Sequence, residues 1–286
     1  MSPKPDLLKI RAEIDRIDEA IHDLLIERAA LLADVRRAKG PGRPVVAPGR
    51  EVSILRRLVA RHRGDFPAAN LARIWREIIS TSVRLQGPFA VAVKLAQRAE
   101  WESWDAARDY FGSGTPLVPV TSATAAVRAV TDGTVTFAVI PWPNEDGGDA
   151  WWRALLTEDP AALRIIGRLP FVIPAAGRPA QLDAAVVGNL PPEPTGDDRM
   201  LIGIDLAEEM SRGRLKDVMA AAGLDALAFW SWYDPARPGA SQHLVEVADF
   251  VTGDDPRLSV LREVAGPALA GVFVVGGYAA PIVLPG

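Results

Sequence analysis

The sequence predicts a multidomain protein in which an all-α segment of three helices precedes an α/β region and an α+β unit. Up to Gly87, apolar residues recur every three or four positions, which is the period of a helix buried on one face. From Pro88 onward, short apolar runs alternate with helical segments, as in α/β and α+β units. A chain of 286 residues, 49% of them hydrophobic, is long enough for two or three such units. We therefore expect domains at residues 1–87, 88–195 and 196–286.

Composition argues against several kinds of partner. The formal net charge of -4 disfavours nucleic acid as a bulk partner, because a phosphate-binding surface normally needs a basic excess. The chain has no Cys and three scattered His, so neither a sulfur-bound zinc site nor a histidine metal cage is expected. The charged N-terminal stretch does not resemble a signal peptide, which predicts a cytoplasmic protein. An uncharged stretch at 264–286 is interrupted by Gly and Pro, so we expect a buried strand there and no membrane span.

The first expected helix spans about residues 6–39 and ends at the Gly/Pro run 40–42. At about 1.5 Å per residue it would extend roughly 50 Å, more than two short helices can cover. Its apolar stripe therefore predicts packing against a second copy, and hence a homodimer. The stripe alternates spacings of four and three residues and consists of Ile10, Ile14, Ile17, Ile21, Leu24, Leu31 and Val35.

One position of this stripe is occupied by Arg28, where helix packing favours Leu. A buried guanidinium without a partner costs several kcal/mol, so Arg28 requires an anionic partner, unless it extends to water. Lys39 lies nearly three turns further along, about 16 Å away on the same side. Arg11 is roughly 25 Å from Arg28 and turned by about 100° around the helix. Arg11 can therefore share a small ligand with Arg28 only across two chains.

Two shorter helices are expected after Pro48 and after Pro67, and polar residues recur in their apolar stripes. Glu51 begins the stripe of the second helix, while Ser82 and Gln86 lie four residues apart on one side of the third. Several cations, one carboxylate and two neutral hydrogen-bonding groups suit a small dianion that also carries a hydroxyl.

These residues belong to a recognisable pattern. The run LLKIRAEIDRIDEAIHDLLIERAALLADVRRAK precedes a Gly/Pro loop, the pair Arg-Glu, and IISTSVRLQ, which keeps an IIxxSVxxQ pattern. The segment 6–87 thus resembles the all-helical chorismate mutases, found alone or at the front of the bifunctional P-protein of phenylalanine synthesis. The resemblance implies an intertwined dimer of three-helix chains that converts chorismate to prephenate without metal or cofactor.

The resemblance also implies roles for individual residues. Arg28 and Ser82 would hold one carboxylate of chorismate. Lys39 and the partner subunit's Arg11 would engage carboxylates as well. Lys39 together with Gln86 would bind the ether oxygen, on which negative charge grows as the C–O bond breaks.

Two further roles concern the start of the second helix. Glu51 would bind the ring hydroxyl of chorismate through a hydrogen bond, and Arg50 would support the site electrostatically. The family carries an acidic residue just before this pair, whereas the sequence at 46–49 is Val-Ala-Pro-Gly. We expect this departure to affect efficiency more than the identity of the reaction.

The remainder of the chain follows the P-protein layout in outline. AVRAVTDGTVTFAVIPWPNED resembles the first lobe of prephenate dehydratases, and the βαββαβ order after residue 196 resembles the ferredoxin-like ACT domain, with VFVVGGYAAP as its closing strand. The expected elements are strand 89–95, helix 101–111, strand 116–120, helix 122–132, strands 135–140 and 200–206, helix 213–222, strands 227–232 and 244–251, helix 256–264 and strand 271–278.

This C-terminal half departs from the pattern in its functional motifs. No Thr-Arg-Phe is present, and about 110 residues are too few for two full dehydratase lobes. SRGRL and SWYDPARPG replace the usual ligand motifs of the sensor domain. We therefore expect a degenerate region without dehydratase activity, in which Trp142, Trp151 and Trp152 serve packing. Thr121, Ser122 and Asn144 fit a residual pocket and fit helix capping or turn formation equally well.

Three functions remain open from the sequence. The first is a chorismate mutase with a degenerate C-terminal half. The second is an isochorismate pyruvate lyase, which uses the same helical scaffold. The third is a non-catalytic module that binds metabolites and regulates a partner, although cations in an apolar seam disfavour a pure scaffold.

Overall fold

The computed structural model describes residues 6–39, 46–87, 89–95, 100–144, 149–173 and 183–284. Within these ranges the three N-terminal helices are confirmed as α1 (Leu7–Lys39), α2 (Pro48–Arg61) and α3 (Ala68–Gln86). The expected stop of the first helix at 40–42 lies outside the described residues. Pro48 stands in the first turn of α2, where its fixed φ and missing N–H are tolerated.

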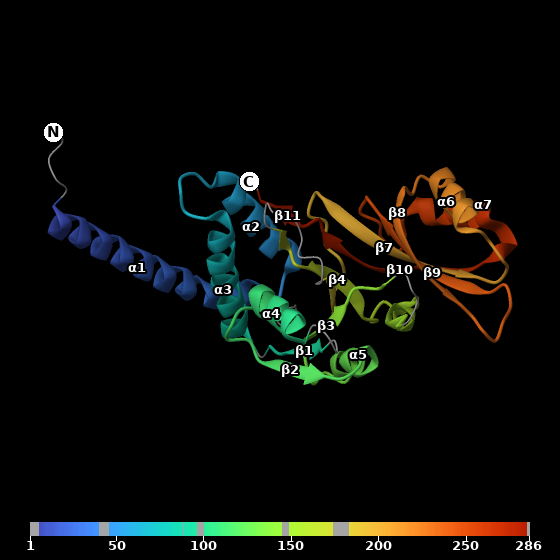
Figure 1. Cartoon of the computed structure of the whole chain (residues 1–286), viewed down its shortest axis with the longest axis horizontal. Coiled ribbons are helices and arrows are strands. Elements are labelled where there is room, and N and C mark those ends of the chain that lie inside the picture. Colours follow the sequence, from blue (N-terminus) through green and yellow to red (C-terminus); the bar gives the residue numbers. More distant parts are fainter. Residues whose placement is uncertain are drawn as a thin grey trace.

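Helix α1 stretches away from the rest of the molecule, and only its C-terminal part lies beside α3 (Figure 1). Its apolar stripe is consequently uncovered within one chain. Ile14, Ile21 and Leu24 are 51%, 52% and 63% exposed, values far from those of core residues. Such a large exposed apolar surface marks an interaction site.

Helices α2 and α3 pack against the body of the protein. Val52, Leu55 and Ile79 are buried with Phe171 and Ala279, which belong to the C-terminal part of the chain. The helical segment is therefore joined to the rest of the molecule by a shared apolar cluster.

Arg56 of α2 adds polar links at this junction. Its guanidinium donates to the Thr195 carbonyl and Oγ1 at 3.1 and 3.0 Å. It also donates to the carbonyls of Asp197 and Ala280 at 2.8 and 3.0 Å. One side chain of α2 thus ties down two backbone segments of the C-terminal part.

The body of the protein is built around a nine-stranded sheet in the order β2-β1-β3-β6-β4-β10-β7-β9-β8. The α/β portion begins with three parallel strands, and its two helices lie on opposite faces. Successive residues of a strand point to opposite faces, so Val91 and Val93 pack under one helix while Ala92 packs under the other. The elements are β1 (Val91–Lys94), α4 (Glu100–Phe111), β2 (Leu117–Val120), α5 (Ala123–Thr131) and β3 (Phe137–Pro141). All five were expected from the sequence.

The next part of the chain contains elements that the sequence did not predict. They are η1 (Trp151–Leu155), β4 (Arg164–Leu169), β5 (Val172–Ile173) and β6 (Ala184–Gly188). Strand β6 pairs antiparallel with both β3 and β4, so it extends the sheet toward the C-terminal unit. The short β5 pairs instead with β11 (Ile282–Val283) in a separate two-stranded sheet.

The C-terminal unit has the expected βαββαβ order. Its elements are β7 (Asp198–Leu206), α6 (Arg212–Ala221), β8 (Ala226–Tyr233), β9 (Ser241–Val247), α7 (Pro256–Ala265), η2 (Gly266–Ala268) and β10 (Leu269–Ala279). The antiparallel order β10-β7-β9-β8 is the ferredoxin-like arrangement, with α6 and α7 over one apolar face (Figure 1). The sequence placed the third strand of this unit at 244–251, whereas β9 spans Ser241–Val247. Val251 is buried although it lies beyond the end of β9, so the apolar pattern in the sequence runs past the strand.

A single contact makes the sheet continuous between the α/β part and the ferredoxin-like unit. Gly276 of β10 pairs in parallel with Ile165 of β4. Gly276 has φ of +144°, and a Cβ there would lie 2.1 Å from the Ile165 carbonyl oxygen. Only glycine fits at this join.

Candidate active site

Arg28 of α1 and Ser82 of α3, both among the expected site residues, are in contact. The Arg28 guanidinium donates to Ser82 Oγ, and Ser82 Oγ donates at 2.7 Å to the carbonyl of Ile78 on its own helix. Ser82 is 7% exposed, and partial burial lowers the pKa of Arg28 from its usual range. A guanidinium is not deprotonated in proteins at neutral pH, so Arg28 remains a cation. A half-buried cation is therefore held on a buried hydroxyl without a carboxylate in the contact.

Gln86 lies one turn beyond Ser82 and is also buried. Its Nε2 donates at 3.0 Å to the Ser82 carbonyl, while its Oε1 is buried without a hydrogen-bond partner. Leaving a buried polar atom unpaired costs free energy, so such atoms are concentrated where a ligand or water completes the set. The structure thus brings Arg28, Ser82 and Gln86 together at the contact of α1 with α3.

Three other predicted residues are not part of this cluster. Arg11 and Arg50 are exposed, and the side chain of Lys39 lies outside the described residues. Arg11 stands seventeen residues before Arg28 on one continuous helix, a separation of about 25 Å. Within a single chain, Arg11 and Arg28 cannot touch the same small molecule.

Glu51 contacts a residue that the sequence analysis did not single out. Arg76 Nη1 of α3 donates to Glu51 Oε2 at 3.0 Å, and the two side chains are 5% and 14% exposed. Arg76 precedes Gln86 by ten residues, about 15 Å along α3. A signal for it exists in the sequence, because Arg76 occupies the buried stripe of Ala72, Ile79 and Val83.

The guanidinium of Arg76 is also covered by aromatic rings from outside the three helices. It lies 4.0 Å from the ring centre of Tyr110 on α4 and 5.2 Å from that of Phe171 after β4. Burial raises the pKa of Tyr110, and the nearby Arg76 cation opposes that rise. The Glu51 carboxylate is thus oriented through groups of the α/β part.

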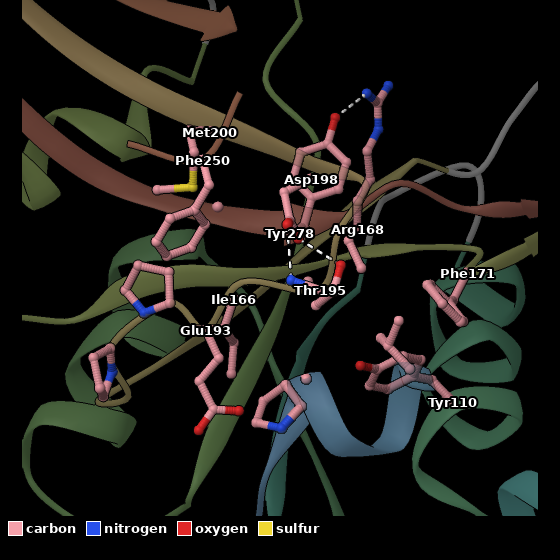
Figure 2. A pocket seen from close by; sticks show the side chains of 18 residues that line it. Tyr110, Ile166, Arg168, Phe171, Glu193, Thr195, Asp198, Met200, Phe250 and Tyr278 are labelled. Carbon is pink, nitrogen blue, oxygen red and sulfur yellow. Dashed lines mark hydrogen bonds between the residues drawn. The ribbon is translucent and has the colours of Figure 1, made fainter. Parts of the chain in front are cut away.

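A small cavity lies between the first turn of α2 and strands β4, β7 and β10 (Figure 2). Asp198 accepts a hydrogen bond from the Thr195 backbone N–H at 2.8 Å, and Arg168 donates to the Tyr278 hydroxyl at 2.8 Å. The open space is about 30 Å³, which is the volume of a water molecule. This junction therefore has a structural role and does not accommodate an organic substrate.

The three tryptophans serve packing as expected, and Ser122, whose role the sequence left open, serves as a helix cap. Trp142, Trp151 and Trp152 are buried in one apolar cluster, and Trp151 Nε1 donates to the Pro141 carbonyl at 3.1 Å. Ser122 caps α5 by accepting from the Ala125 N–H at 3.1 Å. Among the described residues, no group of three or more His, Cys, Asp or Glu side chains is placed to hold a metal ion. In the same residues, no helix has the length and apolar character needed to cross a bilayer.

Comparisons with known proteins identify the N-terminal segment. Residues 10–87 match the family model described as chorismate mutase type II. The resemblance of the three helices to the chorismate mutases, predicted from the sequence, is confirmed by this match.

Relatives extend the likeness into the α/β part. The chain is 32% identical over 154 residues to a "Bifunctional chorismate mutase/prephenate dehydratase" of Stutzerimonas stutzeri, covering 52% of this chain and 42% of that one. It is 30% identical over 154 residues to the protein of the same name from Pseudomonas aeruginosa, with the same coverage. The chain therefore spans about two fifths of the length of these curated relatives.

Solved structures of low sequence identity are also similar. A quorum-quenching acylase, GqqA, has a TM-score of 0.49 at 18% identity, covering 66% of this chain and 95% of that one. Prephenate dehydratase from Streptococcus mutans has a TM-score of 0.47 at 16% identity, covering 67% and 99%.

Proposed function

We propose that this protein is a chorismate mutase, which rearranges chorismate to prephenate in aromatic amino acid biosynthesis. The observation that carries the proposal is the meeting of Arg28, Ser82 and Gln86 in the segment that matches the chorismate mutase family. A half-buried cation on a neutral hydroxyl is suited to receive a substrate carboxylate, since it has no protein carboxylate competing in that contact.

The chemistry requires little from the protein besides positioning and electrostatics. The rearrangement breaks a C–O bond as a C–C bond forms, without proton transfer or nucleophile. Arg28 and Ser82 hold one carboxylate, and Lys39 and Gln86 stabilise the negative charge growing on the ether oxygen. Gln86 would turn its amide from the Ser82 carbonyl to donate from Nε2 to that oxygen.

Glu51 is proposed to accept a hydrogen bond from the ring hydroxyl of chorismate. Arg50 is proposed to support the site electrostatically. In the single chain Glu51 is paired with Arg76, about three turns along α3 from Gln86. Its contact with the substrate therefore requires α2 and α3 to adjust when the second chain joins, or the side chain to turn toward the site.

The site is proposed to be shared between two chains. The exposed stripe of α1 provides the surface for a homodimer, and the length of α1 separates Arg11 from Arg28 of its own chain. Pairing two copies along α1 covers the stripe and brings the partner subunit's Arg11 to the carboxylates.

The segments 88–195 and 196–286 are proposed to form a degenerate dehydratase-like region and an ACT-like domain. The absence of a Thr-Arg-Phe motif from the sequence supports a lack of dehydratase activity. In the places of the usual ligand motifs stand SRGRL and SWYDPARPG, where Ser211 caps α6 and Asp234 pairs with Arg237.

The experiment is to incubate purified protein with chorismate and to measure chorismate loss, prephenate and phenylpyruvate separately. Prephenate without phenylpyruvate supports the proposal. Phenylpyruvate would overturn the proposed lack of dehydratase activity, and no chorismate loss would favour a regulatory module. Salicylate fluorescence from isochorismate would instead indicate a pyruvate lyase.

A further inference from the structure

We propose that Tyr110 of α4 is a positioning residue of the mutase site, which acts through Arg76 on Glu51. The inference rests on the proposed function, in which Glu51 accepts a hydrogen bond from the substrate hydroxyl. Tyr110 lies outside residues 10–87, the segment that matches the chorismate mutase family. The α/β part thereby contributes to the mutase reaction without touching the substrate.

The C-terminal end of α4 is fixed on α3 by polar contacts. Three charged side chains of α3 each hold a group in the last turn of α4 or just after it. The contacts join Arg73 to Asp109 at 2.6 Å, Glu77 to the Ser113 N–H at 2.7 Å and Arg84 to the Gly114 carbonyl at 2.6 Å. Sliding or rotating α4 along α3 would break several of these contacts at once.

A close approach of the two helices adds to this fixed register. Gly112 follows the last residue of α4 with φ of +82°, and a Cβ there would lie 2.8 Å from Ser80 Cβ on α3. A larger residue would push the helices apart. Because Tyr110 stands two residues before Gly112, the same approach brings its side chain onto α3.

The ring of Tyr110 covers the guanidinium of Arg76. The guanidinium carbon lies 4.0 Å from the ring centre, a cation–π contact, and 5.2 Å from the ring centre of Phe171. Burial raises the pKa of Tyr110, so its ring is uncharged at neutral pH and presents an electron-rich face to the cation. An arginine side chain has several rotatable bonds, and rings that cover its end remove much of that freedom.

The confined guanidinium determines where the Glu51 carboxylate lies. Arg76 Nη1 donates to Glu51 Oε2 at 3.0 Å, from α3 to the first turn of α2. A carboxylate accepts hydrogen bonds on both oxygens, so this contact is compatible with one from the substrate hydroxyl. Because Arg76 belongs to α3, the pair ties Glu51 to the helix that carries Ser82 and Gln86. When α2 and α3 adjust to the second chain, Glu51 is therefore held close to α3.

The first test is the rate at which full-chain variants of Tyr110 consume chorismate. Tyr110→Leu fills the space with an apolar side chain but removes the ring. Its kcat/KM should fall about tenfold or more, because displacing a substrate-binding group by about 1 Å can cost about a hundredfold in rate. Tyr110→Phe keeps the ring and should stay within about threefold of wild type. Circular dichroism checks that each variant is folded.

Phe111→Leu is the matched control. Phe111 is the neighbour of Tyr110 on α4 and is also buried, but its ring packs on Phe89 and Phe137. This variant loses a ring from the same helix without uncovering Arg76. Its kcat/KM should therefore stay within about twofold of wild type.

The second test is a double-mutant cycle with Glu51→Gln, which separates positioning from a general structural effect. Since Tyr110 is proposed to act through Glu51, Tyr110→Leu should change kcat/KM by no more than about twofold once Glu51→Gln is present. A purely structural role would cost the same factor in both backgrounds.

Three results would overturn the positioning role while leaving the mutase function in place. They are wild-type kcat/KM in Tyr110→Leu, equal losses from Tyr110→Leu with and without Glu51→Gln, and a loss in Tyr110→Phe as large as in Tyr110→Leu. A wild-type protein that consumes no chorismate would instead overturn the proposed function, and the role of Tyr110 with it.

Discussion

Arg76 and Glu51 form a buried ion pair, with Nη1 and Oε2 3.0 Å apart, that links α3 to the first turn of α2. Tyr110 and Phe171 cover the same guanidinium from the α/β part. The proposed hydroxyl-binding carboxylate of the mutase domain is therefore oriented by residues beyond the matched segment 10–87. This relationship explains how a short helical domain can depend on the region that follows it.

Removing one member of this pair should destabilise the protein strongly. We expect Arg76→Gln to lower the free energy of unfolding by about 3 kcal/mol, because the Glu51 carboxylate loses its cation in a buried site. The double variant Arg76→Gln, Glu51→Gln should recover part of that loss, since the buried carboxylate that Arg76 pairs with is removed as well. Urea denaturation measures the free energy of unfolding of wild type, of Arg76→Gln, of Glu51→Gln and of the double variant. Losses that simply add in the double variant would show that the two side chains are not coupled.

The apolar stripe of α1 predicts the oligomeric state. Ile14→Glu and Ile21→Glu each place a charge in the proposed interface and should shift the protein from dimer to monomer, as measured by light scattering. Ile26→Glu is the matched control, because Ile26 is equally exposed but lies off the stripe, and it should leave the dimer intact. A wild-type protein that is monomeric at micromolar concentration would contradict the proposed interface.

The uncharged amide of Gln86 predicts how activity depends on pH. Wild-type turnover should stay level through neutrality, because a glutamine does not titrate. In Gln86→Glu a carboxylate faces the ether oxygen on which negative charge grows, so activity should rise as the pH falls and the carboxyl is protonated. Gln86→Ala should be slow at every pH without this slope. If the turnover of Gln86→Glu did not change with pH, residue 86 would not contact the reacting atoms.

Because His243 is buried, we expect the protein to lose stability in acid. Burial, with a smaller contribution from Arg212, lowers the pKa of His243 to about 4, and its ring nitrogens lie 2.8 and 2.9 Å from Ser231 Oγ and Ser241 Oγ. Since the unfolded chain binds this proton at higher pH than the folded one, stability falls as the pH drops below about 6.5. We expect a loss of about 2 kcal/mol between about pH 7 and pH 5 from this residue.

Denaturation curves over that range should show a smaller loss for His243→Gln than for wild type. The exposed His22→Gln is the control and should keep the wild-type dependence. Equal dependence in wild type and His243→Gln would mean that His243 does not titrate as described.

Much of the architecture follows from local patterns in the sequence. The 3.6-residue period fixes α1, α2 and α3 within a few residues, and the βαββαβ order predicts the ferredoxin-like unit. Arg28 and Ser82 could each be singled out in advance because each is a polar interruption of an apolar stripe, whereas their pairing was implied only by the family resemblance.

What the sequence did not predict depends on long-range contacts. Strand β6 is short, buried on both faces and rich in Ala and Val, so its pattern does not distinguish it from a buried helix. The continuous sheet rests on one pairing, Gly276 with Ile165, between residues more than a hundred positions apart. Arg76 interrupts a stripe as Arg28 does, but its aromatic partners come from the α/β part and could not be read from its own helix.

The most direct test of a mutase site formed by two chains is complementation. Arg11→Ala and Arg28→Ala should each consume chorismate at least about a hundredfold more slowly than wild type while remaining folded. Co-refolded in equal amounts, they should regain about a quarter of wild-type turnover, because half of the dimers then contain one intact site of two. Arg28→Ala co-refolded with Ser82→Ala is the control and should regain nothing, since both changes lie in the same half of the site. Near wild-type turnover by either single variant, or a mixture as inactive as its parts, would contradict the account.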